Sequence, residues 1–283
     1  MEKNILVTGA NGQLGCAIRT LASKRDDCTF HFTDVDTLDI CDAAQMADYL
    51  RRYRIQYLLN CAAYTAVDRA EDDEETCMRI NRDAVQTIGE VAQMQGVKVI
   101  HVSTDYVFDG RATRPYRETD ATHPLSAYGR SKQAGEVALL QACPEAVIIR
   151  TAWLYAECGS NFVKTVLRLG NERDELNVVA DQTGTPTYAR DLAAAMLTVA
   201  THSDFVPGIY HYSGGGNICS WYDFAVKILT LAGLNCRVRP IATCDYPTRA
   251  IRPAYSALDK EKIKRIYRVD VPDWETSLQQ CIR

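Results

Sequence analysis

A chain of 283 residues with 47% apolar and 24% charged side chains can bury a sizeable core, which excludes a disordered chain or a disulfide-stapled miniprotein. The formal net charge of −4, with both signs well mixed, argues against nucleic acid as a partner. No apolar run approaches the roughly 20 residues that span a bilayer, and the first residues read as a strand rather than a signal peptide. Eleven cysteines without a C-x-x-C pair fit free thiols in a reducing compartment. We therefore expect a cytoplasmic globular protein without a membrane partner.

The first half of the chain alternates between short apolar runs and helix-length segments. The predicted strands are Asn4–Thr8, Thr29–Thr33, Tyr57–Cys61, Val97–Ser103 and Ala146–Thr151. The helices predicted between them are Leu14–Lys24, Ala43–Tyr53, Asp83–Gln95 and Ala127–Gln141. Strands separated by helices of this length form repeated β-α-β units, whose crossovers are almost always right-handed. The pattern predicts the α/β class, with a Rossmann-like, doubly wound parallel sheet.

Beyond about residue 151, glycine and proline interrupt shorter elements. Two amphipathic helices are predicted there, Arg190–Thr201 and Trp221–Leu231. No flexible linker or internal repeat separates the two halves. We expect residues 1–151 to form the sheet domain and residues 152–283 a smaller, less regular lobe, with the option that its chain crosses back to the sheet.

A glycine-rich turn follows the first predicted strand and opens the first helix. Gly9, Gly12 and Gly15 have the spacing G-x-x-G-x-x-G. Glycine permits unusual backbone angles and lets a pyrophosphate approach the helix N-terminus, and the last glycine allows close helix–strand packing. A strand-to-helix turn that merely needs glycine is the alternative. The position directly after a buried strand favours dinucleotide binding.

An acidic residue ends the second predicted strand. There Asp34 can accept hydrogen bonds from the ribose hydroxyls of an adenosine, although Asp36 and Asp39 leave the choice of acid open. A carboxylate at this place would repel a 2′-phosphate. It therefore favours NAD over NADP.

Hydroxyl residues end the fourth predicted strand, and a tyrosine–lysine pair opens the next helix. Ser103 and Thr104 would face the crevice at the carboxyl ends of the strands, where ligands bind in doubly wound sheets. Tyr128 and Lys132 have the spacing Y-x-x-x-K, which places both side chains on one helix face. A nearby cation lowers the pKa of a tyrosine toward the range useful for proton transfer. The alternative is two unrelated residues on an exposed helix. Together with the glycine turn and the strand-end hydroxyls, the pair favours acid–base chemistry in one cleft.

With these motifs the chain resembles the extended short-chain dehydrogenase/reductase family over nearly its whole length. The glycine turn and Y-x-x-x-K are typical of the whole superfamily, whereas three stretches are more specific. They run from Asn60 to Glu71, from Ser103 to Gly110 (S-T-D-Y-V-F-D-G) and from Asp181 to Thr187 (D-Q-T-G-T-P-T). The resemblance implies an NAD(P)-binding domain at residues 1–151 and a lobe at residues 152–283 that binds a nucleotide-activated deoxysugar. It implies reduction of the C4 keto group of dTDP-4-dehydro-β-L-rhamnose to give dTDP-L-rhamnose.

The resemblance also implies roles for single residues. The residues expected to hold the cofactor are Gly9, Gly12, Gln13, Leu14, Gly15, Asp34, Asp39, Ile40, Ala62, Ala63, Thr65, Tyr128 and Lys132. The residues expected to contact the sugar are Thr104, Asp105 and Trp153. Tyr128 would give the proton to the new alkoxide, while Lys132 and Thr104 would stabilise the developing charge. The family implies NADPH with NADH also accepted, whereas Asp34 favours NADH.

Metal binding is not expected from this sequence. Some family members hold Mg²⁺ at a dimer interface through glutamates, one of which lies on the first helix just after the glycine turn. Here that turn reads Gly15-Cys16-Ala17-Ile18 and contains no acid, although Mg²⁺ needs oxygen ligands. The histidines and cysteines show no metal-ligand spacing. The sequence leaves the oligomeric state open, and a homodimer is one option.

Two alternatives stay open at this level. An epimerase or dehydratase of the same fold needs further acid–base residues, often a glutamate beside the strand-end threonine, where this chain has Asp105-Tyr106. A non-catalytic subunit, like the regulatory partner of methionine adenosyltransferase, could lose the tyrosine–lysine pair without penalty. Tyr128 and Lys132 are both present here.

Overall fold

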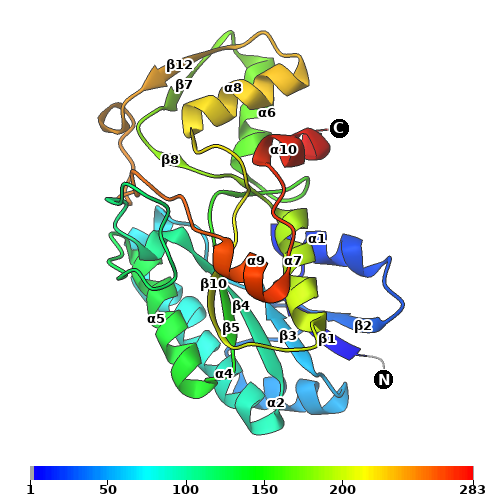
Figure 1. Cartoon of the computed structure of the whole chain (residues 1–283). Coiled ribbons are helices and arrows are strands. Elements are labelled where there is room, and N and C mark those ends of the chain that lie inside the picture. Colours follow the sequence, from blue (N-terminus) through cyan, green and yellow to red (C-terminus); the bar gives the residue numbers. More distant parts are fainter. Residues whose placement is uncertain (1–2, 283) are drawn as a thin grey trace.

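The computed structural model describes residues 3–282, and its centre is a six-stranded parallel sheet (Figure 1). The strand order is β10-β5-β4-β3-β1-β2, and every neighbouring pair is parallel. The strands are β1 Lys3–Thr8, β2 Cys28–Phe32, β3 Tyr57–Asn60, β4 Lys98–Thr104, β5 Val147–Thr151 and β10 Gly208–His211. The predicted doubly wound sheet is therefore confirmed, and each of its first five strands lies within one residue of its predicted bounds.

Helices cover both faces of this sheet (Figure 1). One face packs against α1 Gln13–Ala22, α7 Ala189–Thr201 and α9 Glu261–Tyr267. The other face packs against α2 Ala43–Arg52, α4 Ala84–Gln95 and α5 Ala127–Ala142. Because both faces are covered, strands β1 and β3 are apolar at consecutive positions, as fully buried parallel strands should be.

The third predicted helix, Asp83–Gln95, belongs to a longer and less regular helical segment. A short helix α3, Glu74–Met78, continues through a π-helical turn, η2 Arg79–Asp83, into α4. Within that turn the buried amide of Asn81 accepts from the backbone N–H of Tyr64, donates to the carbonyl of Tyr64 and donates to Ser131. π-Helical turns often occur at functional sites. Here the turn ties the loop after β3 to helix α5.

A smaller lobe lies beyond the carboxyl ends of the strands (Figure 1). It packs helices α6 Phe162–Glu172, α8 Trp221–Ala232 and α10 Trp274–Ile282 around an aromatic core and a parallel pair, β7 Glu175–Val179 with β12 Arg237–Ile241. Two-residue strands complete it: β6 Leu154–Tyr155 with β9 Thr187–Tyr188, and β8 Thr183–Gly184 with β11 Cys219–Ser220. Between these segments the chain returns to the large sheet, where α7 covers one face and β10 forms the edge strand.

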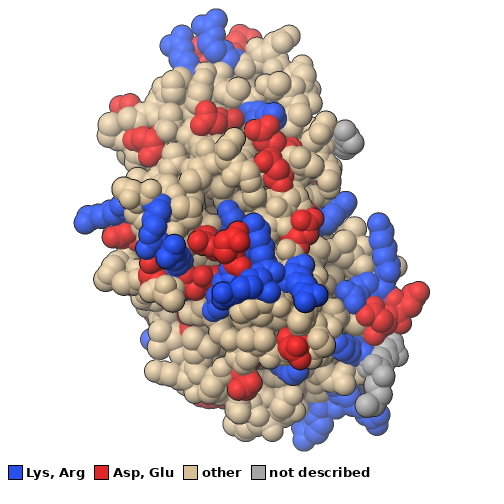
Figure 2. All heavy atoms as spheres, viewed as in Figure 1, with Lys and Arg blue, Asp and Glu red and all other residues tan. Residues whose placement is uncertain are grey.

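The surface carries both signs of charge. In the view of Figure 2, basic side chains gather over α9 and acidic side chains adjoin them, as in the pair of Lys264 with Glu261. Along residues 3–282, no helix combines the length and the apolar character needed to cross a membrane.

Candidate active site

A cavity of about 670 Å³ opens between the sheet and the smaller lobe. The last residues of β1, β4 and β5, which are Thr8, Thr104 and Thr151, all line it. Ligands in open α/β sheets bind at this edge. Every residue expected to touch the cofactor or the sugar lines this cavity, except Gly15. Arg79 and Ser160 also line it, and the sequence did not point to either.

The glycine turn brings backbone rather than side chains to one end of the cavity. Gly9 has φ +64°, and a Cβ there would lie 2.6 Å from the backbone nitrogen of Ala62. A Cβ on Gly15 would lie 2.5 Å from the Cα of Ala10, so the close packing of α1 against the turn requires a glycine there. Gly12 precedes the first residue of α1 and provides no side-chain cap. The first N–H groups of α1 therefore remain available to an anion, which fits a dinucleotide pyrophosphate.

The two acids expected at the adenosine end line the cavity together. One oxygen of Asp34 accepts from the backbone N–H of Asn11 at 2.8 Å and the other from that of Val35 at 2.9 Å. Asp39 accepts from the backbone N–H of Cys41. The exposed Arg79 lines the same cavity. This end thus offers a cation as well as carboxylates to the ribose of an adenosine.

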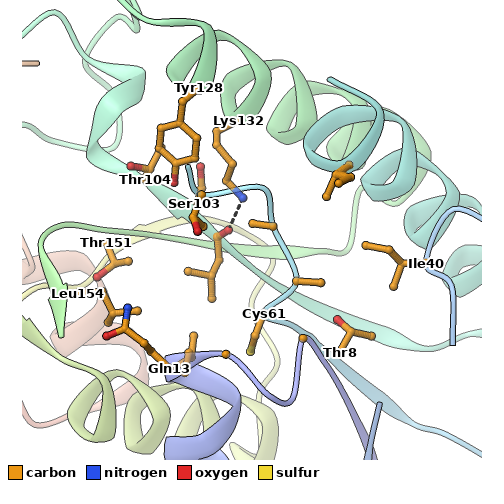
Figure 3. A pocket seen from close by; sticks show the side chains of 18 of the residues that line it. Thr8, Gln13, Ile40, Cys61, Ser103, Thr104, Tyr128, Lys132, Thr151 and Leu154 are labelled. Carbon is orange, nitrogen blue, oxygen red and sulfur yellow. Dashed lines mark hydrogen bonds between the residues drawn. The ribbon is translucent and has the colours of Figure 1, made fainter. Parts of the chain in front are cut away.

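The predicted acid–base residues converge at the other end of the cavity (Figure 3). Tyr128 and Lys132 lie in the first two turns of α5, which begins after Ser126, whose hydroxyl accepts from the backbone N–H of Gly129 at 3.1 Å. Tyr128 is 9% exposed and Lys132 is 2% exposed. Figure 3 shows both side chains directed from α5 toward the strand-end hydroxyls. The hydroxyl of Thr104 donates to Asp105 at 3.0 Å.

Burial controls the electrostatics of this end. Burial raises the pKa of Tyr128 above its ordinary value, and a hydrogen bond with Thr104 offsets only part of that increase. Burial lowers the pKa of Lys132 to about 8 and raises the pKa of Asp105 to about 7. The expectation that Lys132 pulls the pKa of Tyr128 down is not met in this structure. The reason is geometric, because the amine of Lys132 points to β4 and donates to the carbonyl oxygen of Val102 at 2.7 Å.

Two buried oxygens in the cavity have no hydrogen-bond partner among the described residues. They are Oγ of Ser103 and Oδ2 of Asp105. An unpaired buried oxygen is unfavourable unless a ligand or water satisfies it. Both atoms lie beside Thr104, so this end of the cavity fits a ligand with several hydroxyl or carbonyl groups.

An aromatic stack forms the wall on the side of the smaller lobe. Trp153 has φ +50°, an uncommon conformation for a bulky residue, and its ring stacks on Trp221 with centroids 3.6 Å apart. A Cβ on Gly184 would lie 3.1 Å from the ring of Trp153. Strained residues of this kind cluster at ligand sites. The sequence pointed to Trp153, but a positive φ depends on the tertiary surroundings and left no local signal.

Comparison with known proteins agrees with this geometry. Residues 3–283 match the family described as RmlD substrate binding domain. A dTDP-4-dehydrorhamnose reductase of Sinorhizobium fredii is 41% identical over 98% of this chain and 96% of its own length. The corresponding enzyme of Escherichia coli K12 is 40% identical over 99% of this chain and 97% of its own length. A crystal structure of the Bacillus anthracis reductase in complex with NADP superposes with a TM-score of 0.93 at 36% identity, covering 99% of both chains.

The fold defines an NAD(P)-dependent oxidoreductase of the extended short-chain dehydrogenase/reductase class. Within that class, the chain belongs to the family of dTDP-4-dehydrorhamnose reductases. The interpretation of the chain as a reductase is therefore confirmed at the level of the family.

Proposed function

We propose that the protein reduces the C4 keto group of dTDP-4-dehydro-β-L-rhamnose to give dTDP-L-rhamnose, with a reduced nicotinamide dinucleotide as cofactor. The observation that carries the proposal is the convergence of Tyr128, Lys132 and Thr104 on one cavity at the end of β4. Family membership adds the sugar nucleotide, because the relatives are named for this reaction. One relative from Streptomyces niveus, 36% identical, is named a dTDP-4-keto-6-deoxy-D-glucose reductase, so the sugar itself must be tested.

The residues of the cavity fit the dinucleotide from end to end. The pyrophosphate would be held by the turn at Gly9 and by the uncapped N-terminus of α1 at Gly12, Gln13 and Leu14. The adenosine end would be held by Asp34, Asp39 and Ile40, the middle by Ala62, Ala63 and Thr65, and the nicotinamide ribose by Lys132. When bound, the cofactor supplies the hydride.

The chain's own residues supply the proton and the orientation. A tyrosine of ordinary pKa is already protonated at neutral pH, and burial raises the pKa of Tyr128 further, so Tyr128 carries the proton that a new alkoxide needs. The hydroxyl of Thr104 would hydrogen-bond the same oxygen, and the free oxygen of Asp105 would accept from a sugar hydroxyl. The ring of Trp153 would cover the sugar and exclude water.

Both cofactors should be accepted, with NADPH preferred. Asp34 is engaged by two backbone N–H groups, so its charge is partly neutralised where it would repel a 2′-phosphate. Arg79 at the same end can attract that phosphate. A preference for NADH beyond about a hundredfold in kcat/KM, roughly 2.7 kcal/mol, would show that Asp34 dominates.

The decisive experiment is oxidation of NADPH, followed optically, with a panel of dTDP-4-keto-6-deoxysugars. We expect the highest kcat/KM for dTDP-4-dehydro-β-L-rhamnose and dTDP-L-rhamnose as the product. A higher kcat/KM for another sugar of the panel would mean that this sugar, and not dTDP-4-dehydro-β-L-rhamnose, is the substrate. Cofactor binding without turnover of any keto sugar would favour the regulatory-subunit alternative instead.

We propose further that the protein works in the cytoplasm as a homodimer and without a metal. Support for a reducing compartment comes from its eleven cysteines, all of which are free thiols. Exposed Met94 on α4 and Val137 on α5 offer apolar surface for a second copy. Light scattering should give twice the chain mass, and a monomer would contradict the homodimer. Cell fractionation should recover the activity with cytoplasmic markers rather than outside the cytoplasm. EDTA should leave the activity intact, and a loss that Mg²⁺ restores would contradict the absence of a metal.

A further inference from the structure

A row of buried polar side chains crosses the sheet behind Lys132. In the parallel register Thr8 of β1 lies beside Asn60 of β3, and Asn60 lies beside His101 of β4. Their side chains are in contact: Oγ1 of Thr8 lies 2.7 Å from Oδ1 of Asn60, and Nδ2 of Asn60 lies 2.9 Å from Nδ1 of His101. The row ends at Lys132, whose Nζ lies 3.2 Å from Nε2 of His101. All four residues are at most 2% exposed.

The partners of Asn60 determine where the protons of this row lie. The backbone N–H of Ala62 approaches Oδ1 of Asn60 at 3.2 Å, and a backbone N–H can only donate. The amide oxygen must therefore face Ala62, so the amide NH2 donates to Nδ1 of His101. A neutral imidazole carries one proton, and with Nδ1 accepting, that proton is on Nε2. The N–H of His101 thus points at the amine of Lys132.

The charge of His101 agrees with this assignment. Burial, and after it the positive charge of Lys132, hold the pKa of His101 well below its ordinary value. His101 is therefore neutral at physiological pH, with a single N–H group to place.

A second buried histidine in the same sheet shows the opposite arrangement. Nδ1 of His211 lies 3.0 Å from the carbonyl oxygen of Tyr116, which can only accept, so Nδ1 carries the proton. Nε2 of His211 then presents its lone pair to Nη1 of Arg150 at 3.5 Å. An imidazole beside a permanent cation thus serves as its acceptor. At His101 the amide of Asn60 donates to Nδ1, so the imidazole presents an N–H group, and not a lone pair, to Lys132.

We propose that Asn60 and His101 are positioning residues that present an N–H group, rather than a lone pair, to the amine of Lys132 and thereby weaken its hold on its proton. A neutral amine can accept from this N–H, whereas an ammonium group would face it donor to donor. Burial lowers the pKa of Lys132 from 10.5, the ordinary value for lysine, to about 8, and the N–H of His101 acts in the same direction. The proposal rests on the proposed function only for its catalytic consequence, because the tautomer and the lysine pKa belong to the protein alone.

Other groups around Lys132 act in the opposite direction. The charges of Glu136 on α5, Cys77 on α3 and Cys61 after β3 would each raise the pKa of Lys132. The Glu136 carboxylate is already bound by Arg150, at 2.6 and 2.9 Å, and burial raises the pKa of both thiols, which keeps them neutral. The N–H of His101 therefore faces an amine that has no free anion beside it in the described chain.

The tautomer is tested by NMR on protein labelled with ¹⁵N-histidine, without cofactor or substrate. The chain has five histidines, and the His101 signal is assigned by its loss in His101→Gln. We expect the Nε2–H tautomer for His101 and the Nδ1–H tautomer for His211. An Nδ1–H tautomer at His101 would overturn the proposal, and this measurement stands whether or not the protein reduces the keto sugar.

The coupling to Lys132 is tested by titrating ¹³C-lysine-labelled protein, with the Lys132 signal assigned by Lys132→Met. In Asn60→Asp the carboxylate can only accept, so His101 should switch to Nδ1–H and the pKa of Lys132 should rise by about one unit or more. The matched control is His211→Gln, which removes the other buried imidazole and should leave the pKa of Lys132 unchanged. A rise in Asn60→Asp without the tautomer switch, or an equal rise in His211→Gln, would refute the coupling.

Discussion

Helix α5 packs beside two buried cations that are held in opposite ways, its own Lys132 and Arg150 of β5. Arg150 makes a bidentate ion pair with Glu136, lies over the ring of Phe108 at 5.1 Å and faces the lone pair of His211. Lys132 makes no ion pair within residues 3–282 and donates to one backbone carbonyl. Full pairing fixes the guanidinium in place, whereas burial without an ion pair lowers the pKa of the amine. In the first arrangement the loss of either partner leaves a buried charge unpaired, and the second arrangement is typical of a catalytic site.

The largest expected effect concerns the catalytic side of this comparison. Tyr128→Phe keeps the ring packing against Tyr106 but removes the hydroxyl that protonates the alkoxide. General acid catalysis contributes roughly 10²–10⁴ in rate, so kcat should fall by about that factor. The cofactor Kd, measured by fluorescence titration, should barely change because the hydroxyl serves mainly the transition state. Near-normal kcat would mean that Asp105 or a water held by Thr104 delivers the proton.

Removing Arg150, the cation of the ion pair, should lower stability rather than the catalytic rate. Arg150→Met leaves the carboxylate of Glu136 buried without a partner, so the free energy of unfolding should fall by about 3–5 kcal/mol. Urea denaturation followed by circular dichroism measures this loss. The control Arg150→Met/Glu136→Leu removes both charges and should recover most of the stability. If the double variant were no more stable than the single one, packing over Phe108 rather than charge would explain the loss.

Removing Lys132, the cation without an ion pair, should lower the catalytic rate rather than stability. Lys132→Met should lower kcat by about 10² and raise the cofactor KM, because an oriented cation and a ribose contact are lost together. Stability at pH 7 should not fall, since no ion pair is broken. The folded pKa of Lys132, about 8, lies below the unfolded value of 10.5, so the unfolded chain binds more protons between these values. Wild-type stability should therefore rise relative to Lys132→Met from pH 8 to 10.5. A difference that does not change with pH would contradict the depressed pKa.

The sequence was enough to predict Lys132 as a catalytic residue, but not the surroundings that set its chemistry. Parallel strands such as β1 and β3 are local apolar runs, and Tyr128 and Lys132 share a helix face by spacing alone, so both were predictable. The row from Thr8 to Lys132 joins four elements through strand register, which no local pattern encodes. The same holds for β10, four residues that become a strand only by pairing with β5, and for the π-helical turn that carries Arg79.

A third cation, Arg79, is exposed, so water and salt screen its charge, unlike those of Arg150 and Lys132. An exposed ion pair contributes up to about 1 kcal/mol, so Arg79→Gln should lower kcat/KM for NADPH by up to about fivefold and leave the value for NADH unchanged. The difference should shrink as salt rises, unlike any effect at Lys132. The matched control is Arg82→Gln in the same π-helical turn, because Arg82 pairs with Asp83 outside the cavity and should change neither value. Equal losses for both cofactors in Arg79→Gln would show that Arg79 supports the loop rather than reading the 2′-phosphate, and the preference for NADPH would then have to arise from the backbone around Asp34.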